Sequence, residues 1–124
     1  MRALLSRWGP ALAMMVAIFI ASSLPKAEVP EFGVWDLVVK KGGHLAGYAL
    51  LGAAYLRGLT NGGAATRRQM AAAVALAALY GATDEFHQLF VPGRGAAPLD
   101  VLIDALGATA GVVIRTWVLR RAGM

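Results

Sequence analysis

A long uncharged apolar run near the N-terminus constrains the fold of this chain more than any other feature. No charged residue lies between Arg7 and Lys26, a stretch that contains PALAMMVAIFIASSL. As a helix rising ~1.5 Å per residue, this stretch crosses most of a ~30 Å hydrocarbon layer. A cleaved signal peptide is the alternative, because Arg2 precedes the run and small residues end it. Since the rest of the chain is also membrane-like, we expect a retained first transmembrane helix.

Three further apolar segments predict three more helices. The second contains GGHLAGYALLGAAYL, and residues 34–39 upstream could extend it as a helix along the membrane interface. The third ends before Pro92, and the fourth begins at Pro98, a residue that the first turn of a helix accepts. The helices are expected at about residues 8–24, 42–58, 69–90 and 98–119. The predicted fold is all-α, a single membrane domain over residues 1–124 that forms a polytopic bundle of four transmembrane helices.

The composition agrees with a membrane location. Apolar residues make up 58% of the chain and charged residues 15%, whereas a soluble domain has about a quarter charged residues. The net charge is +5, but the basic residues flank apolar runs without interleaved aromatic side chains, so we expect no nucleic acid partner. The lack of cysteine excludes a disulfide scaffold and a thiolate metal site. Membrane lipids are the expected partners, and a homo-oligomer is an open alternative.

The distribution of lysine and arginine predicts the orientation of the bundle. With the N-terminus inside, the inner loops and helix ends carry eight basic residues and the outer ones carry four. This bias favours both termini on the cytoplasmic side. All seven acidic residues then lie toward the outer face: Glu28, Glu31, Asp36, Asp84, Glu85, Asp100 and Asp104.

Three of the expected helices carry polar side chains at a similar depth below the outer surface. Asp84 and Asp104 each lie six residues, or about 9 Å, from the outer ends of the third and fourth helices. Lys41, His44 and Tyr48 follow one another at intervals of three and four in the second helix, so they share a face. Ionisable residues inside a membrane cost ~2.5 kcal/mol or more each and normally mark a site in the bundle interior.

Pairs of glycines four residues apart occur in the second and fourth helices. They are Gly43 with Gly47 and Gly107 with Gly111. Small residues at this spacing let two backbones approach closely in lipid, so we predict all four as packing positions. The acids of the fourth helix share the face of its glycines, which puts them on the close-packed side.

The charges of this group suggest proton handling. Four carboxylates face Lys41 and Arg94, which leaves a charge of −2 while the histidines are neutral. We therefore expect a proton-sharing cluster, or one with room for a cation. The candidate proton-handling residues are His44, Asp84, Glu85 and Asp104. Asp84 and His87 have a spacing compatible with metal ligation, but no metal site and no cofactor are predicted.

Structural alternatives exist for several of these residues. His44 could cap the second helix and bond to Tyr48, and Asp100 could complement the dipole of the fourth helix. Glu85 could reach the interface and be solvated. Arg94, in a Pro-Gly-Arg-Gly turn, could hold an anion such as phosphate or pair with Asp100 or Glu85.

Three segments resemble the VanZ-like family of bacterial membrane proteins. They are KKGGHLAGYALLG over 40–52, YGATDEFHQLFVPGRG over 80–95 and LDVLIDALGATAG over 99–111, in the family's order and spacing. Ser22-Ser23-Leu24-Pro25 is similar to the Ser-x-x-Pro that often closes the family's first helix. The resemblance covers nearly the whole chain. It implies a membrane bundle with an outward site, in the bacterial cytoplasmic membrane and in a cell-envelope setting.

The resemblance also points to site residues. Beside the proton-handling group, it implies that the substrate is bound by Lys41, Tyr48, Gln88, Arg94 and Asp100. Two features depart from the family pattern: Gly47 stands where many relatives carry Glu, and Gly95 to Ala97 replace polar residues that often follow the motif arginine. The family's name comes from a protein associated with teicoplanin resistance, so a link to glycopeptide resistance is implied by the resemblance alone.

Three functions fit these observations, and whether the protein is an enzyme is open. An envelope protein could bind or modify a polar or phosphorylated headgroup, lipid-linked or from the cell wall, in an outward pocket. The polar groups could instead be an interhelical network that only holds the helices together. A small proton or cation transporter is the third function. However, the inner halves of the helices carry no ionisable residue except Arg57 and Arg115 near the ends, so no through-path is visible.

Overall fold

Four long helices make up most of the described chain. The computed structural model describes residues 2–23, 33–91 and 98–123. In chain order the elements are α1 (Arg2–Ser23), the short 3-10 helix η2 (Gly33–Trp35), α2 (Asp36–Thr60), α3 (Arg67–Gln88) and α4 (Pro98–Arg121). No strand occurs within these ranges, and the all-α prediction is confirmed for them.

The helix boundaries differ from the predicted ones at both ends of the chain. α1 begins at Arg2 rather than near residue 8, and α4 continues to Arg121. Of residues 34–39, predicted as a helical extension of the second helix, residues 36–39 form the first turn of α2, and residues 34–35 belong to η2. The predicted boundaries differ because an apolar run marks only the part of a helix that can lie in the hydrocarbon layer. Charged residues on either side can continue the same helix beyond that run.

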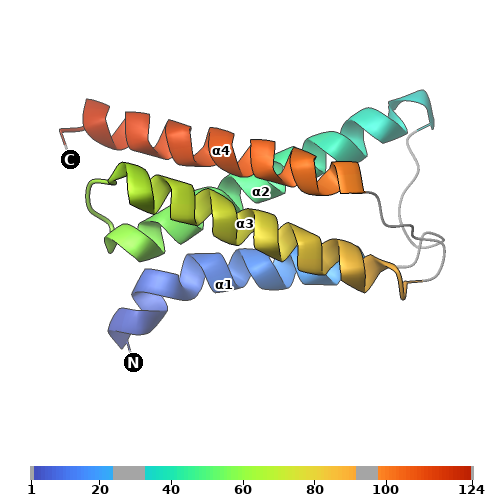
Figure 1. The fold of residues 1–124 in the computed structure, drawn as a ribbon, viewed down its shortest axis with the longest axis horizontal. Helices are drawn as coiled ribbons and strands as arrows, with labels where there is room; N and C mark the ends of the chain where they lie inside the picture. Colours follow the sequence, from blue (N-terminus) through green and yellow to red (C-terminus); the bar gives the residue numbers. More distant parts are fainter. Residues whose placement is uncertain (1, 24–32, 92–97, 124) are drawn as a thin grey trace.

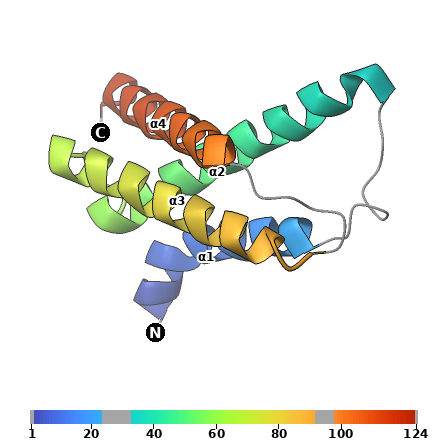
Figure 2. The same cartoon turned by 45° about the vertical axis from the view of Figure 1, so that its right-hand side comes forward.

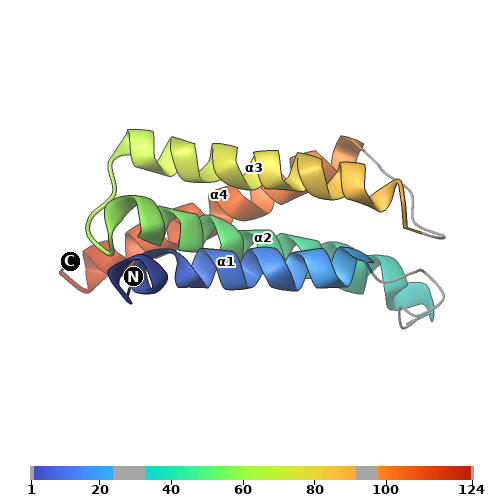
Figure 3. The ribbon, with the colours of Figure 1, turned by 90° about the horizontal axis from the view of Figure 1, so that it is seen from below.

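The long helices alternate in direction. Both termini therefore lie at the same end of the bundle as the turn between α2 and α3 (Figure 1). α2 and α3 each contact the other three long helices, whereas α1 and α4 make no contact with each other within the described ranges. Figure 3 shows α3 above α1 and α2, with α4 passing behind them. The interior is thus formed mainly around α2 and α3.

Local sequence signals fix the turn between α2 and α3. α2 ends at Thr60, and its C-cap residue Asn61 has a left-handed backbone (φ 53°) that is followed by Gly62 at φ 85°. Gly62 N–H then donates to the Arg57 carbonyl, which closes the last turn. At the start of α3, Thr66 and Gln69 form a capping box: Gln69 N–H donates to Thr66 Oγ1 at 3.2 Å, and Thr66 N–H donates to Gln69 Oε1 at 2.9 Å.

α2 and α4 run in the same direction and approach closely along a line of glycines. A Cβ atom at Gly107 would lie 2.6 Å from the Leu45 carbonyl oxygen, and one at Gly111 would lie 1.9 Å from the Ala49 carbonyl oxygen. The prediction that these two glycines are packing positions is therefore confirmed. The backbones could not stay this close with any larger residue at either position.

The corresponding prediction for the second helix is wrong. Among the described residues, no atom outside the adjacent backbone of α2 would lie within 4 Å of a Cβ at Gly43 or Gly47. The α2 glycine that packs against α4 is Gly52, whose Cβ would lie 2.7 Å from the Ala108 carbonyl oxygen. Glycine spacing alone does not show which face of a helix meets a neighbour.

Pro10 interrupts the hydrogen bonds of α1. A proline has no N–H, so the carbonyl four residues earlier, that of Ser6, loses its helical donor. Arg57 Nη2 donates to this carbonyl at 3.3 Å, and Arg7 Nε donates in return to the Gly58 carbonyl. Figure 2 shows the bend in the N-terminal part of α1 near this contact.

The outer surface of the bundle is strongly apolar. α1 and, in α4, Leu99–Arg121 are long and apolar enough to cross a membrane. Only 11% and 33% of the most apolar 18-residue stretch of each helix is buried inside the bundle. Large side chains such as Phe19, Ile20, Ile114 and Trp117 are more than half exposed, which is unusual for a soluble monomer. The described parts of α2 and α3 are less apolar over a comparable length, because polar residues interrupt them.

Candidate functional site

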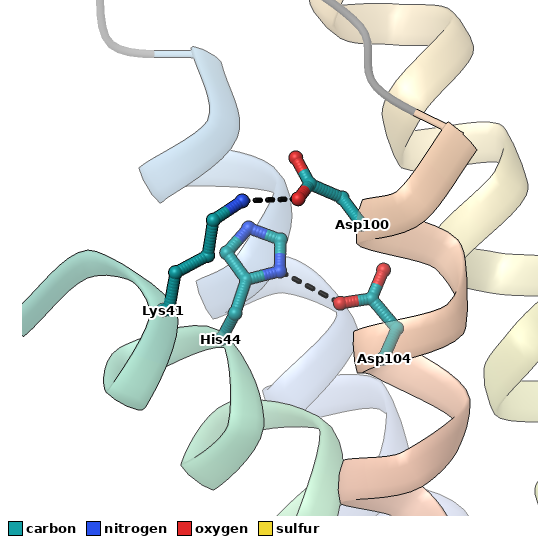
Figure 4. Close-up of polar contacts among 4 residues, drawn as sticks. All are labelled: Lys41, His44, Asp100 and Asp104. Atoms are coloured by element: carbon teal, nitrogen blue, oxygen red, sulfur yellow. Dashed lines mark hydrogen bonds and ion pairs between the residues drawn. The ribbon is translucent and has the colours of Figure 1, made fainter. Parts of the chain in front are cut away.

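Two side chains of α2 pair with two of α4 (Figure 4). The pairs lie in the N-terminal halves of both helices, toward the end of the bundle opposite the termini (Figure 1). His44 Nδ1 lies 2.7 Å from Asp104 Oδ1. Lys41 Nζ pairs with Asp100 Oδ1, and both of these side chains are less buried than Asp104. The structure therefore brings together four residues that sequence spacing placed on single helix faces.

The Asp104 carboxylate orients the His44 ring. A carboxylate bound to Nδ1 favours the tautomer with a proton on that nitrogen, so Nε2 is left as the atom that can accept one. Figure 4 shows Nε2 on the side of the ring toward Lys41 and Asp100. The Tyr48 ring stacks on His44 with centroids 5.8 Å apart and planes 11° apart. Because His44 lies inside α2 and pairs with α4, the alternative that it caps α2 is wrong.

α3 completes the surroundings of Asp104. The Asp104 side chain is fully buried, and its Oδ2 would lie 2.6 Å from a Cβ at Gly81. Gly81 thus leaves the space that the carboxylate fills. Asp84, three residues further on and also on the buried side of α3, is 4% exposed.

Three buried oxygen atoms of this cluster have no hydrogen-bond partner among the described residues. They are Tyr48 Oη, Asp84 Oδ2 and Asp104 Oδ2. A buried polar atom without a partner costs about 1–3 kcal/mol, so three on three different helices require an explanation. Chemically, they could accept hydrogen bonds from a ligand or water, or share a proton.

α1 contributes two serines that the sequence reasoning did not assign to the site. Ser22 is 5% exposed, and its hydroxyl lies near the Asp84 carboxylate. Ser23 Oγ lies 2.9 Å from His87 Nε2 and donates to the Phe19 carbonyl. The Ser-x-x-Pro similarity was the signal that could have pointed to them, although its Leu24 and Pro25 lie outside the described residues.

His87 faces α1 rather than the α2–α4 pairs. Its ring stacks on Phe19 with centroids 4.7 Å apart. Within the described ranges, no group of three or more His, Cys, Asp or Glu side chains has the arrangement of a metal site. The described cluster offers carboxylates, one imidazole, one amine and hydroxyls.

Comparison with known families covers nearly the whole chain. The model of the VanZ/LLP1 family matches residues 8–119. The chain belongs to the VanZ/LLP1 family. Searches of the curated proteins and of the solved structures give no match. Family membership and the two apolar helices together indicate a membrane protein.

The remaining predicted residues of this VanZ/LLP1 protein lie around the same cluster or outside the described ranges. Glu85 and Gln88 are 6% and 4% exposed in the last two turns of α3, so the alternative of a solvated Glu85 is wrong. Asp100 lies in the first turn of α4, the position that its helix-dipole interpretation requires, and it pairs with Lys41. Arg94 lies outside the described residues.

Proposed function

We propose that this VanZ/LLP1 protein crosses the bacterial cytoplasmic membrane four times, with both termini in the cytoplasm. The common end of both termini supports this orientation, because most arginines of the described helices lie toward that end, whereas Asp84, Glu85, Asp100 and Asp104 lie toward the other end. The hydrogen bonds from α2 and α3 to α1 support a first helix that stays with the bundle. In this orientation the polar cluster lies below the outer surface.

We further propose that the cluster binds the polar or phosphorylated headgroup of a compound of the cell envelope. The observation that carries this proposal is that Asp84 and Asp104 each have a buried oxygen with no hydrogen-bond partner among the described residues. A network whose only purpose was to join helices would leave few such atoms, because each one costs stability. Hydroxyl or amine groups of a bound headgroup would satisfy them.

The charges around the cluster support a division of roles. Lys41 has a side chain that is 39% exposed, so its ammonium can reach an anionic group on the bound compound. His44 is held by Asp104, and its Nε2 is the atom suited to take a proton from a bound hydroxyl or water. If the bound headgroup is modified, this proton transfer is the step that the described residues can perform.

The test compares D84N with T83A. Asp84→Asn keeps the size of the side chain but removes its charge. Thr83 is exposed and donates to the Tyr80 carbonyl of its own helix, so Thr83→Ala is a matched control. We expect D84N to change the envelope lipid composition, measured by mass spectrometry, at a normal protein level, whereas T83A leaves it unchanged. A normally inserted D84N protein with an unchanged lipid profile would contradict the proposal.

The same strains test the link to antibiotic resistance. We propose that this protein lowers susceptibility to teicoplanin, as the name of its family implies. Deletion should then increase the inhibition of growth by teicoplanin, and D84N should behave like the deletion. Equal inhibition of all strains by teicoplanin would contradict the link to resistance, and the lipid function would then stand without it.

A structural role is the second candidate, and the two ion pairs between α2 and α4 favour it. If these pairs only hold the helices together, alanine at Asp84 or Asp104 should lower the protein level and the melting temperature. The envelope composition would then follow the protein level alone. Measuring protein level and composition in the same cells separates the two candidates.

A further inference from the structure

A groove lies between α2 and α4 at the end of the bundle that carries both termini. The two helices separate toward this end, beyond their closest approach at Ala49 and Gly111 (Figures 1 and 2). The groove has a volume of about 320 Å³ and is open along one side. Its lining is apolar except for Arg115: Ala49, Leu50, Ala53, Gly111, Ile114, Val118 and Leu119.

Arg115 is an unusual residue for such a lining. Its Nε atom is buried and has no hydrogen-bond partner among the described residues. A second cation, the guanidinium of Arg57, is close enough to act on it, and Arg57 also has a buried Nε without a described partner. The carboxylates of the described parts of α3 and α4, on Asp84, Glu85, Asp100 and Asp104, lie toward the other end of the bundle, and none of them forms an ion pair with either arginine.

We propose that this groove binds an anionic phospholipid, with one acyl chain between α2 and α4 and the phosphate on Arg115. The apolar walls match an acyl chain, and the volume lies in the range of small-molecule sites. A guanidinium binds a phosphate through parallel N–H donors and so gains the acceptors that the protein does not supply. In the proposed orientation, the bound lipid would belong to the inner leaflet of the membrane. The binding itself does not depend on that orientation.

The experiment measures lipid binding to the purified protein in a neutral detergent. Native mass spectrometry with phosphatidylglycerol and with phosphatidylcholine of the same acyl chains gives the affinity for each lipid. We expect the wild type to prefer phosphatidylglycerol by about fivefold or more, since one arginine near a headgroup contributes about 1 kcal/mol. Equal affinities of the wild type for the two lipids would overturn the proposal.

Two variants separate the headgroup from the acyl chain. Arg115→Gln should abolish the preference for phosphatidylglycerol, and Ala53→Phe should fill the groove and weaken the binding of both lipids. Arg120→Gln is the matched control, because Arg120 is exposed in the last turn of α4 and does not line the groove. An equal loss in R115Q and R120Q would indicate diffuse surface charge and overturn the site. Unchanged binding by A53F would remove the acyl chain from it.

Two further measurements keep the test decisive. Arg115→Lys retains the positive charge, so it should fold and keep most of the preference for phosphatidylglycerol even where R115Q is unstable. Loss of this preference in a folded R115K protein would contradict a charge-based site.

Inorganic phosphate should not displace the lipid at equal concentration, because it lacks an acyl chain. Displacement by phosphate would show an anion site without a lipid groove. None of these readouts uses the envelope composition, so this proposal and the proposed function can fail separately.

Discussion

Arg57 of α2 donates a hydrogen bond to the Ser6 carbonyl of α1, the carbonyl that Pro10 leaves without its helical donor. Proline is tolerated in helices that face lipid when a neighbouring group satisfies the freed carbonyl. Here the neighbouring group is a cation from the next helix. The contact joins α1 to α2 at the end of the bundle that carries both termini.

The first prediction concerns this pair. Arg57→Gln should lower the free energy of unfolding by about 0.5–1.5 kcal/mol, the usual net contribution of one hydrogen bond. Pro10→Ala restores a donor for the Ser6 carbonyl within α1, so R57Q should cost less in the P10A background. Unfolding in detergent, measured for both single variants and the double variant, gives the coupling. Equal effects of R57Q in both backgrounds would show that the contact with Ser6 contributes nothing.

The second prediction concerns the glycines of α2 and α4. Gly111→Ala should destabilise the protein by about 1–3 kcal/mol, because its new Cβ overlaps the Ala49 carbonyl oxygen. Gly47→Ala, a control with open space around the new Cβ, should be neutral or stabilising by up to about 1 kcal/mol. Thermal unfolding in detergent measures both. A G111A protein as stable as the wild type would mean that α2 and α4 are further apart.

The third prediction concerns His44 and Asp104. A double-mutant cycle with H44A and D104A should give a coupling free energy of about 1–3 kcal/mol, because the pair is in direct contact and Asp104 is fully buried. The cycle with K41A and D100A should give less than about 1 kcal/mol, since water screens a partly exposed pair. The reverse order would contradict the described burial of the two pairs.

The fourth prediction concerns orientation. The sequence contains no cysteine, so single cysteines can be introduced without removing native ones. Trp35 and Ala64 are exposed at opposite ends of the bundle. In intact cells a membrane-impermeant maleimide should label W35C, while A64C should react only after permeabilisation. The opposite pattern would reverse the proposed topology and place the polar cluster on the cytoplasmic side.

Helical periodicity was enough to predict which polar residues share one face of a helix. Lys41 and His44 share a face of α2, and Asp100 and Asp104 share a face of α4, because intervals of three and four residues bring side chains together. Which helix they meet depends on tertiary packing. The bonds between His44 and Asp104 and between Lys41 and Asp100 could therefore be stated only from the structure.

The errors have a common physical cause. Gly43 and Gly47 have the spacing of packing glycines, but the surface that meets α4 lies on another face of α2, at Gly52. Ser22 was missed for the same reason: it belongs to an apolar helix, and only the position of α3 beside α1 gives its hydroxyl a role. The pattern within one helix carries no information about the rotation of that helix against its neighbours.

The closeness of α2 and α4 at Gly107 and Gly111 has a consequence for how such a protein can evolve. Because the two backbones are in such close contact there, they can hardly slide past each other. The distance between the His44 imidazole and the carboxylates of α4 is therefore set by glycines deeper in the bundle, which have no reactive group themselves. New chemistry at the outer end can then arise by exchanging individual polar residues. Changes at the glycines would instead disturb every polar contact between these two helices at once.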